Sequence, residues 1–207
     1  MKILKETTSK LGNKIRLFGN ENHKHLLVIG VFHGDEPQGD FLINEYLKEH
    51  DNSQILFIPC LNPDGMGLNQ RQNSNGVDLN RNFPTKNWEK AEDEHYFGGD
   101  VPNSEIETKF MVEVLEEFKP KFILSLHAPY CTVNFDGNAI EQANEISKII
   151  GYPVQEDIGY PTPGSFGTYC GVERQIPTIT LELDENVDVT CLIKPVHKIF
   201  DYINSMI

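Results

Sequence analysis

Two histidines and a glutamate have the side-chain chemistry of a metal site. His33 and Glu36 are three positions apart, and His127 follows an apolar run at 122–126. Imidazole nitrogens and carboxylate oxygens bind zinc, and catalytic zinc sites use three protein ligands plus a water. Spacing alone also permits a surface turn at 33–36. It also permits a hydrogen-bonded, non-ligating histidine at 127, which is the commoner role of a lone histidine.

A polar, asparagine-rich segment carries two arginines with the chemistry of an anion site. Arg71 precedes the segment 76–84, which contains Asn80 and Arg81. A guanidinium binds a carboxylate through two parallel hydrogen bonds, which a lysine ammonium cannot do. Asparagine and glycine also serve turn geometry, so the segment is open to either interpretation.

A further acidic residue, Glu182, lies within the strand-like segment 178–183. Burying a carboxylate costs free energy unless it is paired or functional. Strand alternation would also allow Glu182 to face solvent together with Thr178 and Thr180. The pattern by itself leaves both arrangements open.

The hydrophobic pattern predicts strands that alternate with helices. Buried strands are expected at 26–31, 54–60, 121–126 and 178–183. Helices are expected to begin at Pro37, at a capping box of Ser104 and Glu107, at Ala139, and with Pro195 in a first turn. Such alternation predicts an α/β fold: a single domain over residues 1–207, built as a three-layer α/β/α sandwich around a mixed, largely parallel sheet.

The candidate residues follow the ends of these predicted strands. His33, His127 and Glu182 lie at or just past a strand end, and residues 61–103 form a long polar stretch after another strand. Loops of that length in a compact domain are usually functional or disordered. Because ligands of open α/β sheets bind beyond the carboxyl ends of the strands, one shared site is expected at that edge.

The net charge and the cysteines indicate which binding partners and which cellular location to expect. The 207 residues carry a formal net charge of -13, which argues against nucleic acid or an anionic membrane as partner. The longest apolar run, 26–32, is too short to span a bilayer, and residues 1–20 do not resemble a signal peptide. Four scattered cysteines suit free thiols. We expect a cytoplasmic protein, and the sequence does not indicate an oligomeric state.

Taken in order, these residues resemble the zinc metallocarboxypeptidase family, whose best-known members are the pancreatic carboxypeptidases. The resemblance covers residues 26–183 and rests on an ordered series of motifs. They are His-x-x-Glu at 33–36, Asn-Pro-Asp-Gly at 62–65, Arg71, Gly-Val-Asp-Leu-Asn-Arg-Asn-Phe at 76–83, Tyr-Phe-x-Gly at 96–99, Pro-x-Ser-Glu at 102–105, His127, and Thr-Leu-Glu-Leu at 180–183.

The resemblance implies one zinc ion per chain, held by His33, Glu36 and His127. It implies that Asp78 orients the His33 ring, as carboxylate partners of liganding histidines do. It also implies that Glu182 acts as general base toward water and then as acid toward the leaving amine.

The same resemblance assigns residues to the substrate, a small peptide with a free C-terminal carboxylate. Arg71 would stabilise the oxyanion, and Asn80 and Arg81 would bind the terminal carboxylate. Tyr160 would cover the substrate, with Tyr169 as the alternative.

Among family branches, the short chain is most similar to the bacterial murein peptide amidases. That likeness implies release of meso-diaminopimelate from murein tripeptide during cell-wall peptide recycling. One alternative is an N-acyl amino acid deacylase of the aspartoacylase or succinylglutamate desuccinylase type. The segments 62–65 and 102–105 favour the peptidase over it. Another alternative is a zinc-retaining binding protein that has lost catalysis.

Overall fold

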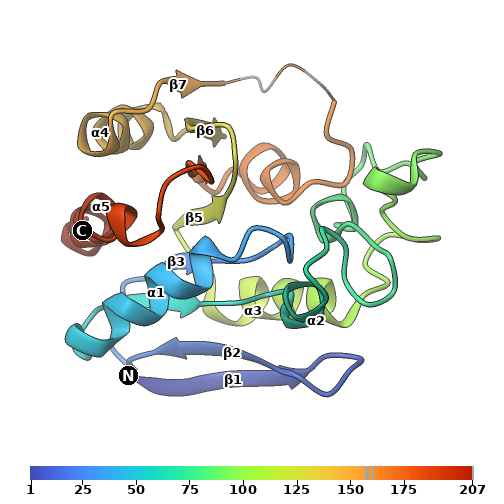
Figure 1. The fold of residues 1–207 in the computed structure, drawn as a ribbon, viewed down its shortest axis with the longest axis horizontal. Helices are drawn as coiled ribbons and strands as arrows, with labels where there is room; N and C mark the ends of the chain where they lie inside the picture. The colour runs from blue at the N-terminus through green and yellow to red at the C-terminus, as the bar shows by residue number, and fades with distance from the viewer. Residues whose placement is uncertain (157–158, 160, 207) are drawn as a thin grey trace.

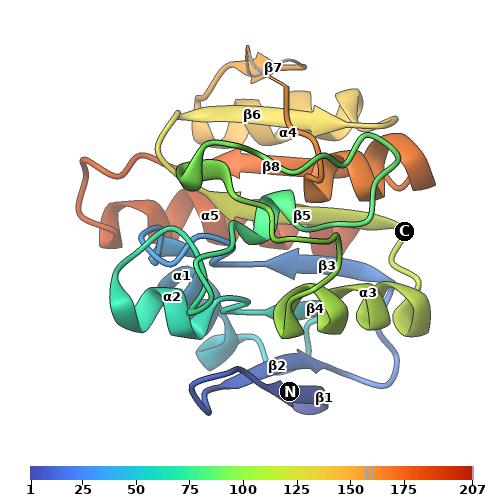
Figure 2. The ribbon, with the colours of Figure 1, turned by 90° about the vertical axis from the view of Figure 1, so that its right-hand side faces the viewer.

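An eight-stranded sheet organises the molecule, here a computed structural model that describes residues 1–156, 159 and 161–206. The strand order is β1-β2-β4-β3-β5-β8-β6-β7, which Figure 2 shows from bottom to top. The strands are β1 (Lys2–Thr8), β2 (Lys14–Gly19), β3 (Leu26–Ile29), β4 (Ile55–Ile58), β5 (Phe122–His127), β6 (Thr132–Asp136), β7 (Val154–Gln155) and β8 (Thr178–Glu182).

The centre of the sheet is parallel, and antiparallel pairs lie on either side of it. β4, β3, β5 and β8 pair in parallel, as do β6 and β7. β1 with β2, β2 with β4, and β6 with β8 pair antiparallel. The central strands β3, β4 and β5 are buried at every residue, because helices cover both faces.

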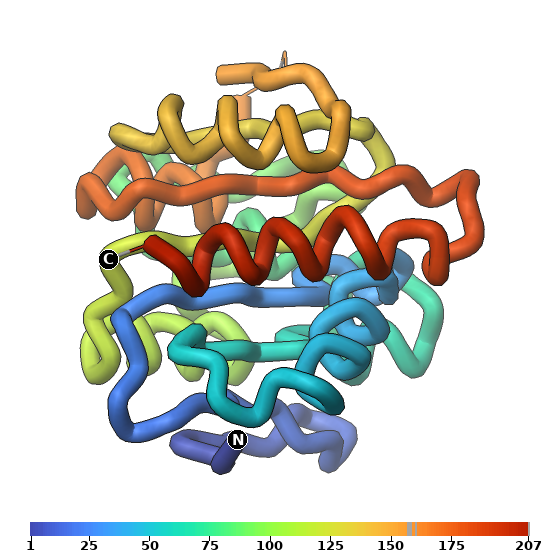
Figure 3. Tube along the Cα trace, turned by 90° about the vertical axis from the view of Figure 1, so that its left-hand side faces the viewer, coloured from blue at the N-terminus to red at the C-terminus, as the bar shows by residue number. Residues whose placement is uncertain are grey.

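Helices form the two outer layers (Figure 1). One face carries α1 (Gln38–Glu49), α4 (Ile140–Ile150) and α5 (Thr190–Ser205), which lie in front in Figure 3. The other face carries α3 (Ile106–Phe118) and the short helix η3 (Thr168–Val172). Successive strand residues alternate between the two cores: Val28 packs with the α1 side and Leu27 with the α3 side. The predicted α/β sandwich with a mixed sheet is confirmed.

The polar stretch at 61–103 contains only short helices. They are α2 (Pro63–Leu68), η1 (Leu79–Arg81) and η2 (Glu94–Tyr96). None of the helices in the described part of the chain is long and apolar enough to cross a membrane.

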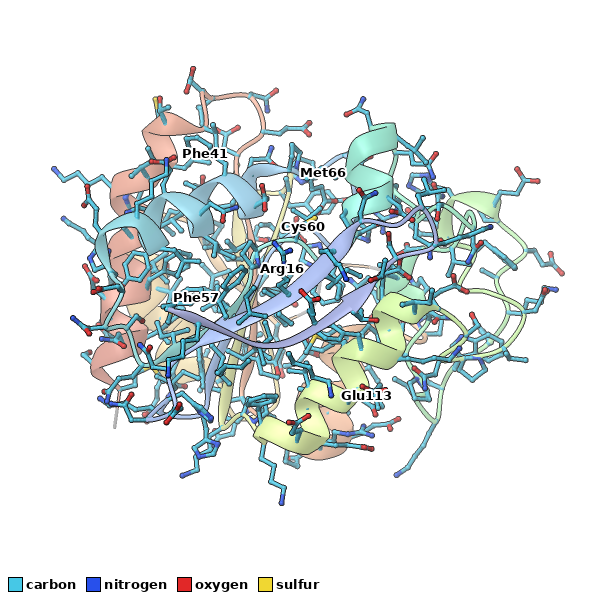
Figure 4. All side chains as sticks on the ribbon, turned by 90° about the horizontal axis from the view of Figure 1, so that it is seen from below. Arg16, Phe41, Phe57, Cys60, Met66 and Glu113 are labelled. Atoms are coloured by element: carbon cyan, nitrogen blue, oxygen red, sulfur yellow. The ribbon has the colours of Figure 1, made fainter. Side chains whose placement is uncertain are left out.

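Four strands were not predicted, because their sequences lack the apolar runs of the central strands. The hairpin β1–β2 forms one edge of the sheet and lies between α1 and α3 in Figure 4. Polar contacts help to hold it there: Lys5 of β1 lies 3.2 Å from Glu113 of α3 and 2.9 Å from Glu117. β6 and β7 form the opposite edge, and β7 has only two residues.

Two predicted helix starts are wrong. α5 begins at Thr190 and contains Pro195 in its interior, because its apolar face continues upstream through buried Leu192. The N-cap of α3 is Glu105, and no side chain caps it. Ser104 instead donates from Oγ to Glu105 and accepts a hydrogen bond from Asn82.

The fully buried central strands should dominate stability. Leu124→Ala on β5 removes a side chain that is 0% exposed, so we expect the free energy of unfolding to fall by about 2–5 kcal/mol. Ile3→Ala on the edge strand β1, where the residue is 48% exposed, is the matched control and should change it by about 0.5 kcal/mol or less. Urea denaturation measures both, and equal losses would contradict this account of the core.

Candidate active site

Three adjacent strand ends bring the candidate residues together. His33 follows β3, while His127 and Glu182 end β5 and β8, where they are register partners. The arrowheads of β3, β5 and β8 point to the same edge in Figure 2. Glu36 lies there too, just before α1, and a cavity of about 420 Å³ opens at this edge. The structure therefore brings these candidate residues together at one edge of the sheet.

A strained turn presents His33 to this cavity. Val31 has φ of 54°, a left-handed conformation that is costly for a β-branched residue. Buried Asn62 holds the turn: its N–H donates to the Val31 carbonyl at 2.9 Å, and its Nδ2 donates to the Phe32 carbonyl at 3.1 Å. A Cβ on Gly34 would overlap the backbone of Gly65, so the two glycines allow the loops to pack.

The ligand atoms of His33, Glu36 and His127 converge. All lie within 4.8 Å of one another, and all three residues are buried. His33 Nδ1 lies 2.7 Å from Glu36 Oε1, and His127 Nδ1 lies 3.1 Å from Glu36 Oε2. Among the described residues, no other group of histidine, cysteine and acidic side chains has the spacing of metal ligands.

Asp78 selects the tautomer of His33. Its Oδ1 lies 3.1 Å from His33 Nε2, so that nitrogen carries the proton and donates it. The Nδ1 lone pair of a neutral His33 then faces a carboxylate oxygen of Glu36, which is repulsive unless a proton or a cation lies between them. A divalent cation with two nitrogen ligands and one oxygen ligand satisfies the arrangement, and this is a donor set that zinc accepts.

The pKa values of the side chains at the site agree with a bound cation. Burial lowers the pKa of His33, but the Glu36 and Asp78 carboxylates outweigh burial and raise it to about 9. Burial raises the pKa of Glu36 and of Asp78, but the neighbouring basic groups together outweigh burial and lower both pKa values. At Glu36 these groups are His33 and His127, and at Asp78 they are His33, Arg71 and Arg81. The two buried carboxylates therefore require positive charge between them, which a metal ion would supply in place of the His33 proton.

Asp78 also holds Arg71. Its Oδ2 accepts from Arg71 Nε at 3.0 Å and from Nη2 at 2.8 Å, so two guanidinium N–H groups share one carboxylate oxygen. This arrangement directs the remaining Nη1 toward the metal-ligand group, 3.8 Å from Glu36 Oε1. The arginine thus places positive charge beside the metal-ligand group.

Arg81 and Asn80 lie on the helical turn η1 and line the same cavity. Arg81 is only 6% exposed, and within the described chain no carboxylate lies within 4 Å of its guanidinium. It donates to the Asn80 carbonyl at 2.7 Å. Asn80 Oδ1 accepts from the Phe166 N–H at 2.9 Å, which leaves the amide NH2 as the donor end. A buried arginine that makes no direct ion pair is suited to an incoming anion.

Glu182 is 8% exposed and does not face solvent. Its Oε2 is buried and makes no hydrogen bond to any described residue. Burial raises the pKa of Glu182 above its ordinary value, and His127 partly opposes that shift. An unsatisfied buried carboxylate oxygen beside a metal-ligand group is the feature expected of a base that awaits water or substrate.

Some residues of the cavity were missed from the sequence, and one predicted residue lies outside the described part of the chain. Tyr96, from the Tyr-Phe-x-Gly motif, lies close to both arginines, with ring centroid 5.6 Å from Arg71 Cζ and 5.5 Å from Arg81 Cζ. Asp136 lines the cavity from β6, a strand that was not predicted. Tyr160 lies outside the described residues. Its alternative, Tyr169, is 3% exposed and packs in the core against Phe83.

The sequence profile of the zinc carboxypeptidase family matches residues 5–146, more than two thirds of the chain. The chain belongs to this family. The matched region includes His33, Glu36 and His127, whereas Glu182 lies beyond it.

Two relatives within the family are similar over most of the chain. Murein peptide amidase A of Vibrio campbellii is 34% identical over 182 residues, covering 79% of this chain and 71% of its own length. Murein peptide amidase A of Escherichia coli K12 is 32% identical over 170 residues, covering 75% and 69%.

Solved structures with the same fold agree with this family assignment. Murein-tripeptide amidase from Escherichia coli O157 superposes with a TM-score of 0.86 at 27% identity, covering 97% of this chain and 90% of the other. Thrombin activatable fibrinolysis inhibitor shares the fold, with a TM-score of 0.72 at 16% identity and coverage of 99% and 70%. This zinc carboxypeptidase family member is therefore a peptide-bond hydrolase.

Removal of a ligand should remove the metal. We expect His33→Ala and His127→Ala to lose stoichiometric zinc, because two remaining ligands are too few for a stable catalytic site. His95→Ala is the matched control, since His95 lines the cavity outside the ligand group. Metal analysis after dialysis measures the content, and a His33 or His127 variant that keeps one equivalent of zinc would exclude that residue from the site.

Proposed function

We propose that the chain is a zinc-dependent carboxypeptidase that hydrolyses the C-terminal peptide bond of small peptides and releases meso-diaminopimelate from murein tripeptide. The observation that carries the proposal is buried Arg81, which makes no ion pair within 4 Å in the described chain and shares a cavity with the ligand group and Glu182. An anion site beside a hydrolytic centre favours substrates that end in a carboxylate.

His33, Glu36 and His127 would hold one zinc ion. When bound, zinc supplies a Lewis acid and lowers the pKa of a coordinated water to about 7. Asp78 keeps the proton of His33 on Nε2, so that Nδ1 is available as a ligand.

Glu182 would transfer a proton from the attacking water to the leaving amine. Its unsatisfied Oε2 accepts a proton from the attacking water, and the resulting carboxylic acid delivers it to the leaving amine. The raised pKa of Glu182 suits both steps, because it brings the base closer to neutral pH than an ordinary glutamate.

The arginines would orient the substrate and stabilise charge. Arg71, fixed by Asp78, directs Nη1 toward the oxyanion that forms at the scissile carbonyl. Arg81 and the Asn80 amide would bind the terminal carboxylate. Anchoring that carboxylate places the last peptide bond at the reacting centre, so the enzyme trims chain ends. Tyr160 is proposed, from family resemblance alone, to cover the bound substrate.

The murein substrate is proposed from the named relatives, both murein peptide amidases. A cytoplasmic location belongs to the same proposal and is supported by four free cysteines. The direct test is release of free diaminopimelate from L-alanyl-γ-D-glutamyl-meso-diaminopimelate by zinc-loaded protein, with an all-L peptide beside it. Release from the murein peptide supports the assignment. Inactivity on both peptides, with zinc verified as bound and N-acyl amino acids hydrolysed instead, would favour a deacylase.

Glu182→Gln should separate metal binding from catalysis. We expect the variant to retain one zinc and to lose at least about a hundredfold in kcat, because an amide cannot accept the proton of the attacking water. Metal analysis and steady-state kinetics on the same preparation measure the two effects. Retained turnover in a folded, zinc-loaded variant would place the base elsewhere.

Arg81→Lys should distinguish peptides by their C-terminus. Loss of the bidentate contact between the guanidinium and the terminal carboxylate should lower kcat/KM for peptides with a free C-terminus by about tenfold to a hundredfold. The kcat/KM for amidated peptides should change little. Arg16→Lys, at an exposed position on β2, is the matched control. Equal losses on free and amidated peptides would reject the carboxylate contact.

A further inference from the structure

The cavity continues from Glu182 along the paired strands β8 and β6. Glu182 pairs with Thr132, Thr180 with Asn134, and Thr178 with Asp136. Asn134, Asp136 and Thr180 all line the cavity. Asp136 lies four residues beyond Thr132, a distance of about 13 Å along the strand. A group that reaches Asp136 from the reacting centre must therefore be carried on a long side chain.

The Asp136 carboxylate is held at the cavity wall without a partner of its own. Across the described chain it makes no ion pair and accepts no hydrogen bond from a side chain or backbone group. Two glycines make room for it: a Cβ on Gly167 would overlap Asp136 Oδ2, and one on Gly171 would overlap Asp136 Cβ. Burial raises the pKa of Asp136 to about 6, so it is still ionised at neutral pH.

Charges around this part of the cavity have one sign. Glu156, next to β7, lines the cavity as well, and no lysine among the described residues does. The two arginines that line it are already assigned: Arg71 pairs with Asp78, and Arg81 is the proposed anchor for the terminal carboxylate. The environment of Asp136 therefore suits a cation and offers no cationic partner to an anion.

We propose that Asp136 binds the side-chain ammonium of the residue that the enzyme releases. This inference rests on the proposed carboxypeptidase function and deepens it by naming the class of released residue: one with a long, cationic side chain. Diaminopimelate fits through its distal amine. Its distal carboxylate has no cationic partner in the cavity, so lysine and diaminopimelate amidated at that carboxylate are equally members of the class.

Peptides that differ only in the last residue test this. The series is L-alanyl-γ-D-glutamyl-X, where X is meso-diaminopimelate, its distal amide, L-lysine, 2-aminopimelate or norleucine. We expect the first three to be released with kcat/KM values within about tenfold of each other. The last two lack the distal amine and should be slower by about tenfold to a hundredfold. The inference is overturned if 2-aminopimelate is released as well as diaminopimelate, or if amidation costs as much as removal of the amine.

Asp136→Asn tests the residue itself. The change preserves size, so we expect unchanged unfolding and a loss of about tenfold to a hundredfold in kcat/KM for the lysine and diaminopimelate peptides. Release of norleucine should change little. Glu185→Gln, which removes a negative charge from the exposed rim of the same cavity, is the matched control and should not alter this selectivity. The same selectivity loss in both variants would indicate a general field effect and reject pairing with Asp136.

Failure of the inference can be told apart from failure of the proposed function. If the wild-type protein releases X from the series and Asp136→Asn lowers all peptides equally, the carboxypeptidase stands and Asp136 is not the specificity residue. If zinc-loaded wild-type protein releases none of the five residues, the proposed function itself fails.

Discussion

A buried carboxylate, Asp78, joins the parts of this site that come from different elements. One oxygen meets His33 Nε2 and the Asn80 N–H, and the other accepts two hydrogen bonds from Arg71. A carboxylate that is 0% exposed is tolerated only because each oxygen has charged or polar partners. The orientation of a metal ligand, the placement of an arginine and the cap of η1 thus depend on a single charge.

The sheet supplies the rigid part of the site and the polar stretch supplies the rest. Buried parallel strands carry His127 and Glu182 at adjacent ends, so their separation is set by strand pairing. Residues 61–103 bring Asn62 under the His33 turn and Arg71 beside the metal-ligand group. Catalytic groups held by rigid strands and buried hydrogen bonds need little reorganisation when substrate binds.

Charge divides the cavity into regions with different tasks. Arg71 and Arg81 both lie close to Tyr96 at one region, where negative charge of the substrate and of the transition state would be placed. Asp136 occupies another region with Glu156, where positive charge is favoured. A peptide whose last residue has a terminal carboxylate and a distant amine matches both. Under the proposals made here, the first region determines where the chain is cut and the second which residue is released.

Local sequence determined the central strands, because residues buried on both faces must be apolar in an unbroken run. It also placed His33, His127 and Glu182 at strand ends, from which a shared edge follows for parallel strands. Tertiary structure alone decided that Glu182 faces the cavity, that Tyr96 lies close to two arginines, and that β6 presents Asp136 there. Those placements depend on strand register and on loop packing between segments distant in sequence. Such long-range contacts produce no periodic pattern in the local sequence, so the sequence alone does not predict them.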